Sequence, residues 1–276
     1  MKKLSYLAVA AALPLCFACS RPQSNQDNEA EADEAPAAEV PAEPEEEVAE
    51  PFTVKEYEKK VGENELEIDF PTSGSPELIA AIGSWINSSL TGTYRGKPDN
   101  GEALFRHYAV ALGQDEDLNE FGGYAVDKFE LGFTSSRVVT YDYTSYTYEG
   151  GAHGMGGTYG TTFLRSDGRI FSRSCITSYK ALHNLFVEGL KKTFKAKSDS
   201  ELLANLLNVS SIAKLPAPAL DPWIEEEGVV FSYTPYEIAP YSAGSPRVVI
   251  PFAKILPYLT EEGKLFITPQ EADESK

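Results

Sequence analysis

The segment YEGGAHG, at residues 148–154, brings together residue types that can do chemistry in a loop. Its histidine could act as a general acid or base or bind a metal, and its glycine-rich backbone could hold a phosphate. The glycines could instead serve only a turn, because glycine adopts backbone conformations that other residues avoid. The segment therefore raises four hypotheses: a catalytic loop, a metal site, a phosphate-binding loop and a structural turn.

The surrounding sequence argues against a phosphate site and a metal site. A phosphate-binding loop leads into a helix, whereas the residues that follow, TYGTTFL, are strand-like and contain no Gly-Lys-Ser or Gly-Lys-Thr. A zinc site needs three or four well-placed ligands, and His107, His153 and His183 are far apart in the sequence. We therefore expect neither a metal nor another cofactor.

No complete catalytic motif accompanies the histidine. The sequence has no Gly-x-Ser-x-Gly, and the nearest preceding serine, Ser145, lies in a predicted strand. Aspartates and glutamates are plentiful, but no pair stands out as the two carboxylates of a glycosidase. We predict that His153 hydrogen-bonds to neighbouring backbone and fastens the loop, and that the chain is not an enzyme. The alternative hypothesis is a peptidoglycan or glycan hydrolase that uses His153 with a carboxylate.

The elements that position this loop follow one another as strands, helices and strands. Residues 52–70 form two alternating stretches around Gly62-Glu63-Asn64, and Ser75-Pro76 is a favoured helix start. Residues 123–133 and 137–148 are rich in β-branched and aromatic residues, which predicts two antiparallel strands. Since strands and helices do not alternate regularly, we predict an α+β fold with mainly antiparallel sheets packed with three to four helices.

The second half of the chain carries further element signals. The turn sequence SDGR at 166–169 predicts a hairpin, and Ser198 with Glu201 forms a capping box at the start of a short helix. The stretches VVFSY and RVVIPF are predicted to pair as strands, and Cys175 is expected to be buried. Two further helices are expected at about residues 101–113 and 178–195.

The first residues carry the features of an export signal and a tether. Met-Lys-Lys followed by LSYLAVAAALPLCFAC is typical of a signal peptide, and Ala18-Cys19 resembles a bacterial lipobox. We expect residues 1–19 to be a lipoprotein-type signal peptide with Cys19 lipidated; ordinary secretion is the alternative. Residues 20–51 are acidic and lack aromatic side chains, which predicts a disordered tether.

Charge argues against nucleic-acid binding, and the cysteine content argues against an internal disulfide. The net charge is −18, and residues 27–50 hold eleven acidic residues and no basic one. With these and the three preceding basic residues set aside, residues 51–276 carry −10. No basic stripe is present, which argues against nucleic-acid binding. Only Cys175 follows Cys19, so we expect no internal disulfide.

Two segments resemble a bacterial family of domains of unknown function. Residues 148–154 resemble its Y-x-G-G-A-H-G hallmark, and FSYTPYEIAPYSAG at 231–244 resembles its F-x-Y-x-x-Y-E-I-A-P-Y-A-x-G segment. The stretches 249–252 and 255–259 resemble its closing strand and helix, so the resemblance covers about residues 125–260. This family forms the C-terminal extracellular part of the anti-sigma factor RsiV and also lies beside the catalytic domain of PdaC-type deacetylases.

The resemblance implies a domain organisation and a kind of function. It implies an RsiV-like α+β domain at 123–268, preceded by an N-terminal α+β companion region at 52–122. The last residues, 269–276, are expected to form a frayed tail. It implies protein binding, because the RsiV-like receptor senses lysozyme outside the cell. The sequence departs from that receptor, since no sigma-binding segment, membrane-spanning helix or deacetylase domain is recognisable.

We therefore predict a lipid-anchored, non-catalytic binding module of the bacterial cell envelope, periplasmic or surface-exposed. Its partner is expected to be an envelope protein, a lysozyme-like protein or a cell-wall glycan, with membrane contact through the lipid. Tyrosines on rigid loops give a large contact area at small entropic cost, although Tyr236 and Tyr241 could instead pack in the domain core. The candidate ligand-binding residues are Tyr148, Glu149, Gly150, Gly151, His153, Tyr236, Glu237 and Tyr241.

Overall fold

A computed structural model describes residues 51–115, 118 and 120–267 of the chain. The predicted signal peptide, the lipidation site Cys19, the acidic tether up to residue 50 and the tail at 269–276 lie outside these residues. None of the helices in the described part is long and apolar enough to cross a membrane.

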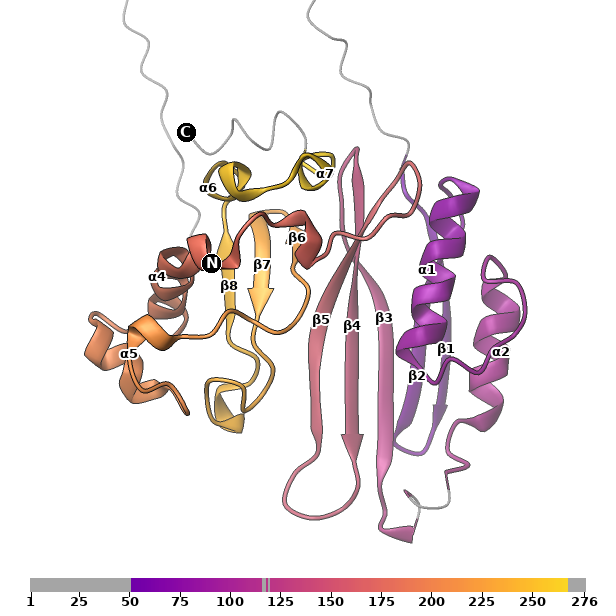
Figure 1. The fold of residues 1–276 in the computed structure, drawn as a ribbon. Helices are drawn as coiled ribbons and strands as arrows, with labels where there is room; N and C mark the ends of the chain where they lie inside the picture. The colour runs from indigo at the N-terminus through magenta and orange to yellow at the C-terminus, as the bar shows by residue number, and fades with distance from the viewer. Residues whose placement is uncertain (1–50, 116–117, 119, 268–276) are drawn as a thin grey trace, which may run out of the picture. The chain divides into compact units, whose positions relative to one another are not determined.

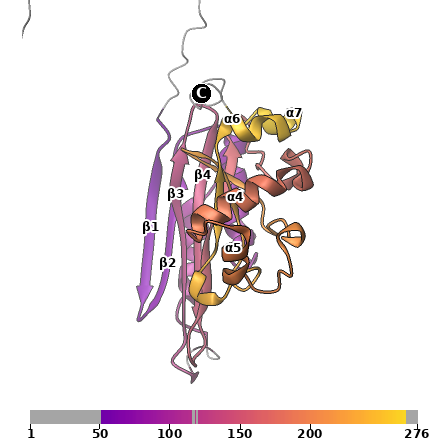
Figure 2. The same ribbon diagram turned by 90° about the vertical axis from the view of Figure 1, so that its left-hand side faces the viewer.

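The larger sheet has five strands that lie side by side in chain order. All neighbours pair antiparallel except β2 and β3, which pair parallel, so the sheet is mixed. The predicted hairpins on either side of this parallel pair are both confirmed. Figure 2 shows β1 as the outermost strand. The strands are β1 (Val54–Val61), β2 (Asn64–Pro71), β3 (Tyr124–Thr134), β4 (Val138–Tyr148) and β5 (Met155–Leu164).

Two helices of the described residues between β2 and β3 cover one face of this sheet (Figure 1). They are α1 (Pro76–Ser89), capped by Ser75 as predicted, and α2 (Gly101–Ala111), capped by Asn100. A long connection of this kind is what allows β2 and β3 to run parallel. The expected N-terminal region at 52–122 and the expected C-terminal domain at 123–268 therefore contribute neighbouring strands, β2 and β3, to one sheet.

The smaller sheet is antiparallel and belongs to the C-terminal half. It contains β6 (Trp223–Glu225), β7 (Gly228–Ser232) and β8 (Arg247–Ile250), and the predicted pairing of VVFSY with RVVIPF is confirmed. The helix α4 (His183–Thr193) packs against this sheet (Figure 2). Three shorter helices follow it along the chain: α5 (Asp199–Asn205), α6 (Phe252–Ile255) and α7 (Glu261–Lys264).

The structure confirms the α+β class and corrects several details. The hairpin predicted around 166–169 is present only as a short antiparallel return. β5 ends at Leu164, a single bridge pairs Phe163 with Ile170, and the Phe171 N–H donates to the Thr162 carbonyl oxygen at 2.9 Å. The helix predicted at 178–195 begins with a 3-10 turn and becomes α-helical only at His183. The three residues of β6 were not predicted, because so short a strand shows no clear alternation.

Two buried threonines join the sheets. Thr140 of β4 donates its hydroxyl hydrogen to the carbonyl oxygen of Ile224 in β6 at 2.7 Å. The hydroxyl oxygen of Thr162 of β5 accepts from the backbone N–H of Ile224 at 2.8 Å, and the two threonine oxygens lie 2.7 Å apart. Since Thr140 already donates to Ile224, the Thr162 hydroxyl donates to Thr140. Every polar group at this buried joint is therefore satisfied, as burial requires.

Replacing Thr162 with valine tests this joint. Valine keeps the side-chain shape but leaves the Ile224 N–H buried without an acceptor, so we expect Thr162→Val to reduce the free energy of unfolding by about 1–3 kcal/mol. Thr158→Val is the matched control, because Thr158 also lies on β5 and also bonds a threonine of β4, Thr144, but on an exposed surface. Urea denaturation measures both. Equal effects of the two substitutions would contradict the proposed role of the joint.

Candidate functional site

The segment YEGGAHG forms the connection between β4 and β5. Gly150 and Gly151 have φ angles of 87° and 97°, a backbone region that residues with a side chain rarely adopt. The Tyr148 hydroxyl donates to the carbonyl oxygen of Gly151 at 3.0 Å and so closes the loop. The two glycines therefore allow the tight turn, as the structural-turn hypothesis expects. The chain then continues into the strand β5.

The loop between β7 and β8 meets this hairpin through an aromatic stack. The rings of His153 and Tyr241 are parallel within 16° and their centres lie 4.3 Å apart. Tyr236 stacks on the same Tyr241 with a centre distance of 5.7 Å. The Nδ1–H of His153 donates to the carbonyl oxygen of Gly154 at 2.9 Å, which orients the imidazole. The two sequence segments singled out as a contact surface thus touch each other.

The imidazole is not packed in a core. His153 is exposed, and Tyr236 keeps 46% of its surface accessible. Tyr236 also has a φ of 67°, which is uncommon for a residue other than glycine, aspartate or asparagine. The rings therefore lie at the surface, with Tyr241 as the shared partner and Tyr236 held in a backbone conformation that costs free energy.

The Glu237 side chain is fixed by hydrogen bonds, most of them within the loop between β7 and β8. One of its carboxylate oxygens accepts from the Thr234 N–H at 2.9 Å and from the Thr234 hydroxyl at 3.1 Å. The other oxygen accepts from the Ala219 N–H at 3.0 Å. Glu149, by contrast, is exposed at the tip of the hairpin. The two predicted glutamates therefore differ: Glu237 fixes the loop beneath the aromatic stack, and Glu149 faces solvent.

Sequence reasoning missed several aromatic residues beside the hairpin. Tyr124 of β3 lies against Tyr146 and Tyr148, with ring centres 5.8 and 5.7 Å apart. The Tyr146 hydroxyl oxygen accepts from the Gly154 N–H at 3.2 Å. Phe121 is 66% exposed and lies next to Gly150. The alternation of tyrosines at 146 and 148 could have shown that both occupy one face of β4.

The described residues around the His153 imidazole provide neither a bonded carboxylate nor a set of metal ligands. Within the described ranges, the hydrogen-bond partner of the His153 ring is backbone, with no carboxylate bonded to it. No group of three or more histidine, cysteine, aspartate or glutamate side chains in those ranges is placed to hold a metal ion. The arrangement offers ring faces and loop backbone to a ligand.

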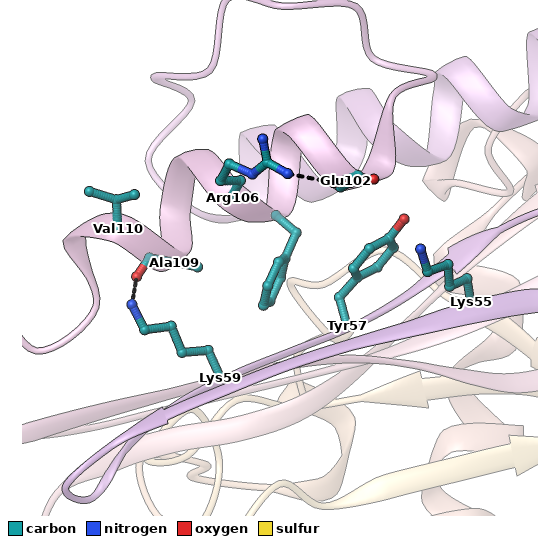
Figure 3. A pocket seen from close by; sticks show the side chains of 8 residues that line it. Lys55, Tyr57, Lys59, Glu102, Arg106, Ala109 and Val110 are labelled. Atoms are coloured by element: carbon teal, nitrogen blue, oxygen red, sulfur yellow. Dashed lines mark hydrogen bonds and ion pairs between the residues drawn. The ribbon is translucent and has the colours of Figure 1, made fainter.

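A groove of about 440 Å³ lies between β1 and α2 (Figure 3). Tyr57 and Phe105 stack within it, with ring centres 5.4 Å apart, and the Lys55 ammonium lies 4.7 Å from the Tyr57 ring centre. The Lys59 ammonium donates to the Ala109 carbonyl oxygen in the last turn of α2, a position where the helix favours a cation. These contacts fasten α2 to the edge strand.

A second cleft, of about 340 Å³, lies where the two sheets meet and is lined by carboxylates. Burial raises the pKa of Asp142 above its usual range, and the nearby Glu225 adds to this effect. Arg247 acts in the opposite direction and pairs with Glu225 at 2.5 Å. The cleft therefore contains its own countercharge.

The sequence and the fold both match a family of unknown function. Residues 171–253 match the family model described as "Protein of unknown function (DUF3298)". This range includes the loop that carries Tyr236 and Tyr241, and it begins after YEGGAHG. The match supports the expectation of a domain-of-unknown-function family, while the RsiV-like relationship stays a prediction. No curated protein matches the chain.

Two solved structures share the fold. A member of the DUF3298 family from Bacteroides fragilis NCTC 9343 has a TM-score of 0.58 and 18% identity, over 81% of this chain and 97% of the other. A DUF3298 family protein from Pseudomonas aeruginosa PAO1 has a TM-score of 0.54 and 18% identity, over 79% of this chain and 98% of the other. At this identity the likeness shows the fold alone.

Replacing Glu237 with glutamine separates its structural role from ligand binding. The amide places N–H groups opposite backbone N–H donors, so we expect Glu237→Gln to reduce the free energy of unfolding by about 1–3 kcal/mol. Glu149→Gln is the control, because Glu149 is exposed; we expect a change within about 0.5 kcal/mol. Urea denaturation of both variants measures the difference. An unchanged stability of Glu237→Gln would show that its carboxylate does not hold the loop.

Proposed function

We propose that this chain is a lipid-anchored, non-catalytic binding module of the bacterial cell envelope, with an RsiV-like relationship to its family. Its ligand is a protein or a cell-wall glycan. The observation that carries the proposal is the convergence of two distant loops on one exposed aromatic stack, formed by His153, Tyr241 and Tyr236.

The chemistry of the stack supports binding. Aromatic rings supply most of the contact energy in many interfaces, and rings on fixed loops lose little conformational entropy when a ligand binds. Tyr236 is both exposed and fixed by the turn that Glu237 closes. Phe121, 66% exposed beside Gly150, extends the apolar surface of the hairpin tip. Large exposed apolar surfaces commonly mark sites of interaction.

Net charge favours basic partners among proteins. Residues 51–276 carry −10, so a basic protein is attracted at long range, and lysozyme is a suitable probe of that class. A glycan would instead use the faces of the rings. Both ligand classes use the same surface, so the same substitutions test both.

The test measures binding of the full-length chain to purified peptidoglycan, by co-sedimentation, and to lysozyme, by biolayer interferometry. We expect saturable binding of one of them, reduced at least about tenfold when Tyr236 and Tyr241 are both replaced by alanine. Ile170→Ala is the control, because Ile170 is exposed but follows the opposite end of β5 from the hairpin.

Two results would contradict the proposal. Binding that survives the double substitution would remove the stack from the contact surface. Release of soluble fragments from peptidoglycan by the unsubstituted chain, lost in His153→Ala, would show a hydrolase instead. Thermal unfolding of each variant, measured alongside, distinguishes a lost contact from a lost fold.

A further inference from the structure

A pocket of about 360 Å³ lies on the helix-covered side of the large sheet, and none of the three rings of the aromatic stack lines it. Its floor comes from β2, β3 and β4, and its walls come from the C-terminal ends of α1 and α2. Most of its lining is apolar or aromatic, which is typical of sites for small organic molecules. The main lining residues of this kind are Leu66, Leu90, Leu112, Leu118, Tyr108 and Tyr143.

Two aspartates, Asp115 and Asp127, line this pocket, and Asp127 lies on its floor in β3. The Tyr143 hydroxyl donates to Asp127 Oδ1 at 2.7 Å, and Ser145 lies directly opposite Asp127 across the strand pair. Both partners are neutral. The neighbouring Lys128 bonds Glu65 and Glu67 instead, because successive side chains of a strand point to opposite faces.

The carboxylate of Asp127 therefore lacks a countercharge. No basic side chain of the described residues forms an ion pair with it, and burial raises its pKa above the usual range while the Tyr143 and Ser145 hydroxyls act against this. Burying a carboxylate without a cation is costly unless it becomes protonated. A cationic ligand would remove that cost.

The ends of two helices add to the negative potential of the pocket. Leu90 and Leu112 are the C-cap residues of α1 and α2, and both line it. The C-terminus of a helix carries a partial negative charge, and neither helix has a basic residue in its last turn. Lys59 bonds the Ala109 carbonyl from the β1 side, where it lines the groove of Figure 3.

We propose that this pocket binds a small organic cation, a primary ammonium group on a short aliphatic chain. The ammonium group bonds the Asp127 carboxylate, and the aliphatic chain lies against Leu66, Leu90 and Leu112. The apolar lining and the Asp127 carboxylate define the ligand class independently of the aromatic stack.

Calorimetric titration of the full-length chain with n-pentylamine at neutral pH tests the proposal, with 1-pentanol as the uncharged probe of similar size. We expect saturable binding of the amine, and binding of the alcohol at least about tenfold weaker, because both can hydrogen-bond the carboxylate but only the ammonium group also forms an ion pair with it. Asp127→Asn should weaken amine binding about tenfold to a hundredfold. Asp142→Asn is the matched control, since Asp142 also has a raised pKa but lines the other cleft.

A second measurement needs no substitution. Carbon-13 NMR follows the titration of the Asp127 carboxyl in the unsubstituted chain, and saturating pentylamine should lower its pKa, because a bound ammonium favours the ionised form. The proposal is overturned if pentylamine does not bind saturably, if pentanol binds equally well, if Asp127→Asn binds as tightly as Asp142→Asn, or if the Asp127 pKa does not fall.

Discussion

The buried joint between the two sheets determines where the candidate binding surface lies. Thr140 and Thr162 satisfy both backbone polar groups of Ile224, at 2.7 and 2.8 Å, in a region with no access to solvent. Without these hydroxyls the backbone of β6 would be buried unsatisfied, at a cost comparable to a lost hydrogen bond. The smaller sheet carries Tyr236 and Tyr241, and the larger sheet carries His153. The stack of these three rings therefore depends on a joint that other residues of the same two sheets form.

Gly160 within β5 allows the sheets to approach closely. A Cβ atom on Gly160 would overlap the Trp223 indole of β6, whereas one on Gly157 would first meet the Tyr159 hydroxyl of its own strand. The indole N–H of Trp223 donates to Glu225, which also pairs with Arg247, and the Arg247 guanidinium lies 5.6 Å from the indole ring centre. Gly160 therefore serves contact between the sheets, whereas Gly150 and Gly151 serve the turn.

Much of the fold could be predicted because its signals are local. The Ser75 cap, the turn at Gly62 and the alternation of β3 and β4 each depend on a few adjacent residues. The parallel pairing of β2 with β3 could not be predicted, since it depends on how α1 and α2 pack on the sheet. The hairpin predicted beyond Leu164 is shorter than expected, because the turn is present but the returning chain forms a single antiparallel bridge, at Ile170.

The candidate site shows the same limit. The sequence pointed to both loops through their glycines, prolines and tyrosines, but it could not show that His153 and Tyr241 stack. It also could not separate Glu237, which bonds its own loop, from the exposed Glu149. Asp127 carried no signal at all, because a single aspartate in a strand looks like any solvent-facing residue of an alternating pattern.

The acidic composition of the chain fits the half-buried Asp127 carboxylate having no ion-pair partner among the described residues. Acidic residues outnumber basic ones, and several cations are already occupied: Lys128 holds Glu65 and Glu67, Arg247 holds Glu225, and Lys59 holds the end of α2. The two neighbours of Asp127 on β4, Tyr143 and Ser145, supply hydroxyl groups, which hydrogen-bond a carboxylate without neutralising its charge. Tyr143 therefore orients the Asp127 carboxylate, and the proposed ammonium ligand would supply its missing countercharge. The leucines at the helix ends limit the size of the apolar part of that ligand.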